Sequence, residues 1–120
     1  MFELSIKSDF ASAHFLKGYD GPCKDLHGHT WKVEVVLQSE KLNSVGLVID
    51  FKEIKKQLKE FLMAIDHVNL NDLSYFQQVN PSTENLAKYI YDGFSKGIQP
   101  LKIKRVTVWE SDVASVTYYE

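Results

Sequence analysis

The strongest constraint on the fold is an alternation of apolar and polar residues in two stretches of the first forty residues. In the first stretch the apolar members are Phe2, Leu4, Ile6 and Phe10. In the second they are Trp31, Val33, Val35 and Leu37. A period of two is typical of a strand that buries one face. We therefore predict two strands, which are antiparallel if they pair directly.

A helical pattern replaces the alternation in the middle of the chain. Asp50 and Glu53 have the spacing of a capping box, in which each side chain accepts a backbone N–H of the other residue. The apolar residues that follow recur at the spacing of one helical face: Ile54, Leu58, Phe61, Leu62 and Ile65. We predict a helix that begins at Asp50 and ends near Asp66.

A second helix is predicted to open in the stretch Pro81–Asn85, where Asn80 or Ser82 can cap the first turn. It ends at Gly97, a residue type common at helix C-termini. Its apolar stripe is Leu86, Ile90 and Phe94. Alternation then returns in two short stretches on either side of a turn at residues 111–114, with Val106, Val108, Val116 and Tyr118 as the apolar members. The order of elements is ββααββ.

This order predicts an α+β fold, in which a four-stranded antiparallel sheet carries two helices on one face. We expect one domain over residues 1–120, because no repeat, low-complexity tract or linker divides the chain. Two layers leave the other face and the edges of the sheet uncovered. Assembly into a closed oligomer is therefore expected.

Composition excludes several classes of partner. The net charge is -2, and no run of Lys or Arg exceeds two residues, so nucleic-acid binding is not expected. No segment approaches the roughly 20 apolar residues of a membrane span, and Met1–Phe10 alternates in polarity, so we do not expect it to be a secretory signal. The single cysteine, Cys23, cannot form an internal disulfide, which fits a reducing compartment. We expect a cytoplasmic protein without a membrane partner.

The segment from Cys23 to His29 contains the clearest chemical motif. His27 and His29 are separated by one glycine at the entrance of a predicted strand, so both rings project to the same side. An isolated pair of this kind is more often accidental than functional. His14, however, ends the first strand, and antiparallel pairing would place it opposite His29. Three protein ligands with an open fourth position are typical of catalytic zinc. We expect carboxylate partners for the imidazole N–H groups.

Two further groups could transfer protons. Cys23 lies four residues before His27, and a nearby divalent cation favours a reactive thiolate, although a lone cysteine is as often buried filler. Asp66 and His67 follow the first helix and could form a proton relay. The alternative is a polar helix end, where histidine is favourable at the negative end of the dipole.

Glu110 continues the face of Val106 and Val108, so a carboxylate is expected at the end of an apolar row. A carboxylate in such a place requires a partner. An arginine would serve, and so would a ligand with two parallel N–H donors, such as the pyrimidine edge of a pterin or guanine.

Taken together, these motifs resemble the family of the 6-pyruvoyltetrahydropterin and 6-carboxytetrahydropterin synthases. The resemblance covers almost the whole chain, and its segments are Phe10–His14, Cys23–His29, Gly46–Phe51, Asp66–Asn71, Asn80–Asn85 and Glu110. It implies the T-fold, in which three subunits close a β-barrel and two trimers stack into a hexamer.

The resemblance also implies roles for individual residues. His14, His27 and His29 would bind Zn2+. The catalytic set would be Cys23, Asp66 and His67, drawn from different subunits. Substrate would be bound by Glu110, as the anchor of the pterin ring, together with Thr83 and Glu84.

The spacing Cys-x3-His-Gly-His is similar to the bacterial carboxy branch of the family. That branch converts 7,8-dihydroneopterin triphosphate to 6-carboxy-5,6,7,8-tetrahydropterin, with release of acetaldehyde and triphosphate, on the route to queuosine. Two departures are Ser82, where many members have threonine, and Trp109, where lysine is frequent. The alternatives are a 6-pyruvoyltetrahydropterin synthase, which eliminates triphosphate from the same substrate, and a non-catalytic zinc- or purine-binding module of the same fold.

Overall fold

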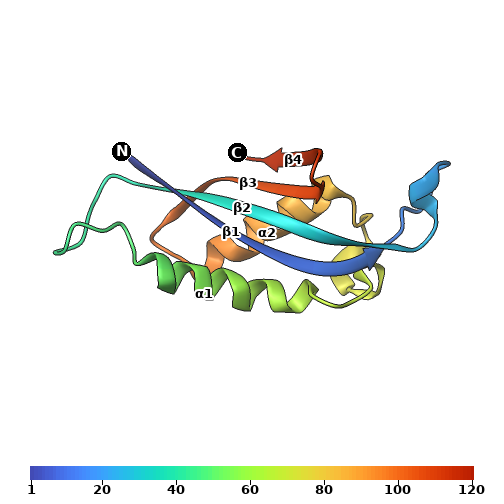
Figure 1. Cartoon of the computed structure of the whole chain (residues 1–120), viewed down its shortest axis with the longest axis horizontal. Coiled ribbons are helices and arrows are strands. Elements are labelled where there is room, and N and C mark those ends of the chain that lie inside the picture. Colours follow the sequence, from blue (N-terminus) through green and yellow to red (C-terminus); the bar gives the residue numbers. More distant parts are fainter.

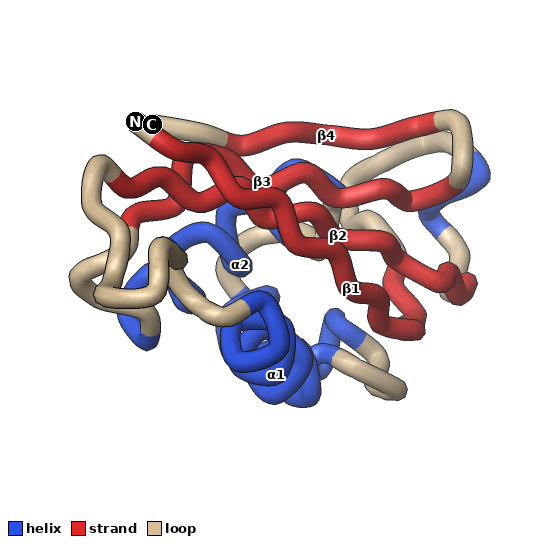
Figure 2. Tube along the Cα trace, turned by 60° about the vertical axis from the view of Figure 1, so that its left-hand side comes forward, coloured by secondary structure: helices blue, strands red, loops and turns tan.

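The computed structural model describes residues 1–120, and its strands form one antiparallel sheet in the order β1-β2-β3-β4. Both helices lie on the same face of this sheet (Figures 1 and 2). The elements are β1 (Phe2–His14), β2 (His27–Ser39), α1 (Phe51–Leu62), α2 (Thr83–Gly97), β3 (Lys102–Ser111) and β4 (Ala114–Tyr118). The predicted α+β class and the order ββααββ are confirmed.

The sheet is built on a long ladder between β1 and β2. Each strand has 13 residues, and the register places Phe10 opposite Trp31. The same register makes His14 the partner of His27, while His29 faces Ser12. The predicted pairing of His14 with His29 was therefore wrong by two residues. The correction keeps all three rings on one face, because a shift of two residues preserves the alternation.

The core lies between the sheet and the two helices. Alternating residues of the strands point into it, and one stripe from each helix packs against them. From the sheet these include Ile6, Phe10, Trp31, Val33, Val35, Leu37, Val106 and Val108. From the helices they include Ile54, Leu58, Leu62, Leu86, Ile90 and Phe94. Full burial of such a side chain contributes about 1.5–3 kcal/mol, so the core holds the sheet and the helices together without help from a ligand.

Side-chain caps fix the beginning of both helices. Asp50 accepts from the backbone N–H of Lys52, and Ser82 accepts from that of Asn85. Asp50 and Ser82 cap their helices as predicted, but the capping box is not formed: Asp50 accepts from Lys52 rather than from Glu53, and the Glu53 side chain accepts from Gln57. The cap on Ser82 matters for function, since it fixes the N-terminal turn of α2 next to the histidines.

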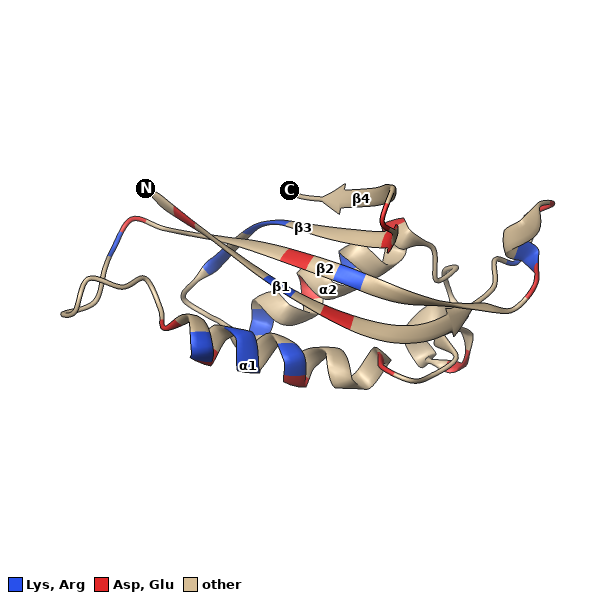
Figure 3. Ribbon diagram, viewed as in Figure 1, with Lys and Arg blue, Asp and Glu red and all other residues tan.

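The second face of the sheet is not covered by any element of the chain. Charged residues of both signs lie along β1, β2 and β3 (Figure 3). Lys32, for example, forms an ion pair with Asp112 at 2.8 Å. None of the helices has the length and apolar character needed to cross a membrane.

Candidate active site

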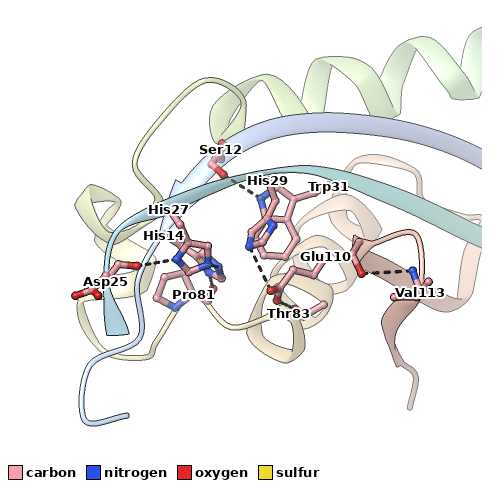
Figure 4. A network of polar contacts seen from close by, with 11 residues as sticks. Ser12, His14, Asp25, His27, His29, Trp31, Pro81, Thr83, Glu110 and Val113 are labelled. Atoms are coloured by element: carbon pink, nitrogen blue, oxygen red, sulfur yellow. Dashed lines mark hydrogen bonds and ion pairs between the residues drawn. The ribbon is translucent and has the colours of Figure 1, made fainter. Parts of the chain in front are cut away.

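Three histidines converge where β1 ends and β2 begins (Figure 4). His14 is the last residue of β1, and His27 and His29 are the first and third residues of β2. One ligand atom from each histidine and one oxygen of Glu110 all lie within 4.8 Å of one another. The sequence predicted that the three histidines would meet, but it did not predict that Glu110 would join them.

Two of the imidazoles are oriented by main-chain carbonyls. Nδ1 of His14 lies 2.6 Å from the carbonyl oxygen of Pro81, and Nδ1 of His27 lies 2.7 Å from that of Asp25. A carbonyl can only accept, so both Nδ1 atoms carry hydrogen, and the neutral form of each ring presents the lone pair of its Nε2 atom to the cluster. The carboxylate partners expected from the sequence are therefore replaced by backbone oxygens, which serve the same orienting role.

The third imidazole supplies the clearest sign that the cluster fits a cation. Nε2 of His29 is buried and has no hydrogen bond of acceptable geometry, although Oε1 of Glu110 lies 3.2 Å away. Burial lowers the pKa of both His14 and His29 from the ordinary imidazole value of 6.5. Neutral imidazoles with converging lone pairs are ligands that zinc accepts, and a buried nitrogen without a partner is costly otherwise.

Trp31 packs against two of the three histidines. Its ring meets His14 and His29 edge to face, with centroids 4.9 and 5.1 Å away. The indole Nε1 donates to the carbonyl of Ser12, and the ring stacks on Phe10 with centroids 6.0 Å apart. The indole is fully buried. Sequence analysis identified Trp31 only as a core residue, because its contact with His14 depends on the register between β1 and β2.

Glu110 connects the histidines to the start of α2. Its Oε2 atom accepts a hydrogen bond of 2.9 Å from the hydroxyl of Thr83, while Oε1 faces His29. Thr83 is buried in the first turn of α2. Glu84 follows it in the chain but is exposed. The structure thus brings Glu110 and Thr83 together and leaves Glu84 on the rim.

Cys23 lies in the loop between β1 and β2, on the short 3-10 turn Pro22–Lys24. Its side chain is a partly buried free thiol, and its carbonyl accepts from the backbone N–H of Leu16. The thiol is not among the group of ligand atoms that the histidines form with Glu110. The loop therefore carries Cys23 near the ends of both strands that supply the histidines, but outside the cluster itself.

Asp66 and His67 lie on the free edge of β1. Oδ1 of Asp66 accepts from the backbone N–H of Ala11 and lies 2.8 Å from Nδ1 of His67. The hydrogen bond from the backbone N–H of Ala11, followed by the interaction with His67, holds the pKa of Asp66 below its ordinary value. His67 is 81% exposed and has a φ of 57°, an uncommon backbone conformation for a residue with a side chain. The two side chains do contact each other, a point that the sequence left open.

Comparisons with known proteins agree with this architecture. The family model described as 6-pyruvoyl tetrahydropterin synthase matches residues 3–120. The solved 6-pyruvoyl tetrahydropterin synthase of Caenorhabditis elegans has the same fold, with a TM-score of 0.88 at 24% identity over 99% of this chain and 95% of that one. The predicted T-fold of the subunit is thereby confirmed.

Three relatives differ in the reaction that their names give. A 6-carboxy-5,6,7,8-tetrahydropterin synthase from Haemophilus influenzae is 29% identical over 100% of both chains. A dihydroneopterin monophosphate aldolase from Pyrococcus furiosus is 35% identical over 88% of this chain and 87% of that protein. A human 6-pyruvoyl tetrahydrobiopterin synthase is 37% identical over 77% of this chain and 65% of that protein. The prediction of an enzyme of the tetrahydropterin synthase type is confirmed, and the chain belongs to the 6-pyruvoyl tetrahydropterin synthase family.

Proposed function

We propose that this protein is a zinc-dependent lyase that converts 7,8-dihydroneopterin triphosphate to 6-carboxy-5,6,7,8-tetrahydropterin, with release of acetaldehyde and triphosphate, in queuosine biosynthesis. The observation that carries the proposal is the convergence of the imidazoles of His14, His27 and His29 next to a loop that bears Cys23. The spacing of that cysteine from the His-Gly-His motif, and a relative with the carboxy name that aligns over the whole chain, favour the carboxy reaction.

His14, His27 and His29 would hold Zn2+. When bound there, zinc would act as a Lewis acid that acidifies hydroxyl groups of the substrate side chain. The protein fixes the nitrogens in advance, because the carbonyls of Pro81 and Asp25 orient two of the rings and Trp31 supports the third. A site prepared in this way loses little entropy when it binds the ion.

Proton transfer would be shared by Cys23 and His67. A thiolate at Cys23 would remove and return protons along the substrate side chain, since redistribution of hydrogen within a pterin requires groups in different protonation states. His67 is oriented by Asp66, which lies 2.8 Å from its Nδ1 and leaves Nε2 free for exchange. The high exposure of His67 fits a role at the surface of a cleft that a second subunit completes.

Glu110 would bind the pterin ring. A carboxylate that accepts from two parallel N–H groups is a strong and geometrically selective contact. The hydroxyl of Thr83 already fixes the rotation of this carboxylate through Oε2. Glu84, which is exposed in the same turn of α2, would line the mouth of the ring pocket.

The active form would be a homo-oligomer in the cytoplasm, either a trimer or a dimer of trimers. In a trimer the sheets would close a β-barrel. The uncovered second face of the sheet and the free edge of β4 support this arrangement, because an exposed edge strand is a ready site for pairing with another chain. No partner beyond the small-molecule substrate and further copies of the chain is required.

Two other reactions remain as candidates because relatives bear their names. One is the formation of a 6-pyruvoyl pterin, as the human relative suggests, and the other is an aldolase reaction on dihydroneopterin monophosphate, as the relative from Pyrococcus furiosus suggests. A binding module without catalysis is a third candidate. The cysteine and the Asp66–His67 pair disfavour it, since binding alone requires neither.

The deciding experiment is incubation of the zinc form with 7,8-dihydroneopterin triphosphate, followed by mass analysis of the pterin and an assay for acetaldehyde. A carboxylated pterin together with acetaldehyde supports the proposal. A pyruvoyl pterin without acetaldehyde would assign the pyruvoyl reaction. No conversion of the triphosphate, with turnover of dihydroneopterin monophosphate, would assign the aldolase. Cys23→Ala is the control, because we expect it to keep zinc and lose turnover.

A further inference from the structure

The edge of β1 that does not pair with β2 has hydrogen-bond partners from Ala11 onward. These partners continue past the end of β1 at His14, as far as Lys17. The backbone of Ala11 bonds with Asp66 and His67, and the N–H of Ala13 donates to the carbonyl of Val68. Ala11 and Ala13 are two residues apart in β1, so the N–H and carbonyl groups of both point to the same edge of the strand. The segment that follows α1 therefore runs beside β1 as an irregular partner strand.

After Ala13, two asparagine side chains take over the role of the partner backbone. Oδ1 of Asn71 accepts from the N–H of Phe15 at 2.9 Å, and its Nδ2 donates to the carbonyl of Phe15 at 3.0 Å. Asn80 makes the same two bonds with Lys17, at 3.0 and 2.9 Å. Each carboxamide thus forms a closed ring with one residue, as a paired residue does in an antiparallel sheet. We call Asn71 and Asn80 the amide clamp.

The amide clamp holds the base of the loop formed by residues 15–26. Leu16 lies between the two clamped residues, and its N–H donates to the carbonyl of Cys23 at 2.9 Å. The clamp is therefore connected to the backbone of Cys23 through one residue. In Figure 1 this loop extends from the ends of β1 and β2 at the far right of the molecule.

The clamp is also attached to the histidine cluster. Asn80 directly precedes Pro81, whose carbonyl orients His14 at 2.6 Å. The carbonyl of Asn80 accepts from Nδ2 of Asn85 in α2. One short segment, residues 80–81, therefore fixes both the loop that carries Cys23 and the orientation of a histidine.

We propose that Asn71 and Asn80 are positioning residues, which hold the loop of residues 15–26 in register with the histidine cluster and so keep Cys23 in place for proton transfer. This inference rests on the proposed function, in which Cys23 exchanges protons with substrate. Asparagine suits the task because its carboxamide both donates and accepts. Aspartate in its place would direct a carboxylate oxygen at the carbonyl of Phe15 or Lys17. Alanine would leave the backbone N–H and carbonyl of that residue without a side-chain partner.

The test compares the parent with Asn80→Ala, Asn71→Ala and a control, Asn43→Ala. Asn43 also uses its side chain to accept from the backbone, at Val45 and Leu47, but it lies in the loop at the other end of the molecule, which is 53 Å long. Because Asn80 is only partly buried, its substitution leaves the core intact. Asn71 is buried, so that variant is the second and more severe case.

Three measurements need no turnover. Hydrogen exchange of residues 15–26 should rise about tenfold or more in both clamp variants, with α1 and β3 unchanged, since each variant loses two hydrogen bonds at the base of this loop. Alkylation of the only cysteine should rise by a similar factor. Bound zinc should stay at the parent level. The Asn43→Ala control should match the parent in all three measurements.

Turnover decides the positioning role. We expect kcat to fall about tenfold or more in the clamp variants, with KM within about twofold of the parent, because the pterin contacts are retained while proton transfer is misaligned. A loop that loosens without loss of kcat would overturn the proposal. So would parent-like exchange and alkylation in both variants, or exchange that rises equally along the whole chain. If the parent itself does not turn over pterin, the proposed function fails, and unchanged exchange and alkylation would still refute the clamp.

Discussion

The Nε2 atoms of His14 and His27 lie 3.0 Å apart, and each ring already donates through Nδ1 to a main-chain carbonyl. When both rings are neutral, their Nε2 lone pairs face each other at hydrogen-bond distance. Burial lowers the pKa of His14, so protonation of that ring is disfavoured. A cation between the rings resolves the conflict, which is the physical reason that this pair indicates a metal site.

Replacing His27 should abolish zinc binding with little effect on the fold. Removal of a residue that only hydrogen-bonds to a metal ligand typically lowers metal affinity 10- to 100-fold. His27→Ala removes a ligand itself, so we expect its zinc affinity to fall by more than about 100-fold. The apo protein should keep its stability within about 1 kcal/mol, because His27 is only partly buried and its removal relieves the facing lone pairs. Zinc content after dialysis against a chelator, and urea unfolding, are the measurements.

The matched control is His67→Ala, which removes an exposed histidine outside the cluster. It should retain zinc at the parent level. Equal loss of zinc in both variants would show that the cluster of His14, His27 and His29 is not the binding site.

Zinc binding should be visible in the fluorescence of one of the two tryptophans. Trp31 lies within 4.9 and 5.1 Å of two imidazoles, so a cation at the histidines changes the charge beside the indole. We expect the change in emission on zinc addition to persist in Trp109→Phe and to vanish in Trp31→Phe. A change that follows Trp109 instead would place the bound ion away from the cluster.

Asp66 should contribute to stability in a pH-dependent way. Its pKa is lowered, chiefly by the N–H of Ala11, so its contribution is complete above the unfolded value of 3.8 and is lost as the pH falls through the folded value. Asp66→Asn should therefore reduce the free energy of unfolding at pH 7 and leave it closer to the parent's at pH 2. Urea titrations at the two pH values measure this difference. A constant difference at both values would exclude ionisation of Asp66 as the cause.

The sequence was sufficient for the fold because each element has a period that buries one face. Phe10 and Trp31 illustrate this, since their parity alone placed both in the core. The pairing register was not predictable in the same way, and His14 was assigned to the wrong partner. Alternation fixes which face a side chain occupies, but a shift of two residues leaves that pattern unchanged.

The candidate site was predicted in its residue types and incompletely in its contacts. His14, His27 and His29 could be grouped because two strand ends must meet wherever the strands pair. The orienting roles of Pro81 and Asp25 could not be predicted, because backbone carbonyls are present in every residue and carry no sequence signal. The position of Glu110 beside His29 depends on the register between β2 and β3, which alternation does not determine.

Glu110→Gln tests whether that carboxylate binds the pterin ring. Glutamine keeps the shape of the side chain but replaces one acceptor with a donor, which then faces an N–H of the ligand. Leaving such a group unpaired costs about 1–3 kcal/mol, which corresponds to roughly a tenfold or greater loss of pterin affinity. Glu53→Gln, on the exposed side of α1, is the matched control and should bind pterin as the parent does.

Two measurements on Glu110→Gln are needed: its pterin affinity by calorimetry and its zinc content. Oε1 of Glu110 lies 3.2 Å from Nε2 of His29 and Oε2 accepts from Thr83, so the carboxylate has contacts with both the ligand cluster and α2. If Glu110 anchors the ring, pterin affinity falls and zinc is retained, because the three imidazoles suffice to hold the ion. Unchanged pterin affinity would exclude Glu110 as the anchor. Loss of zinc in step with pterin would instead assign the carboxylate to the metal.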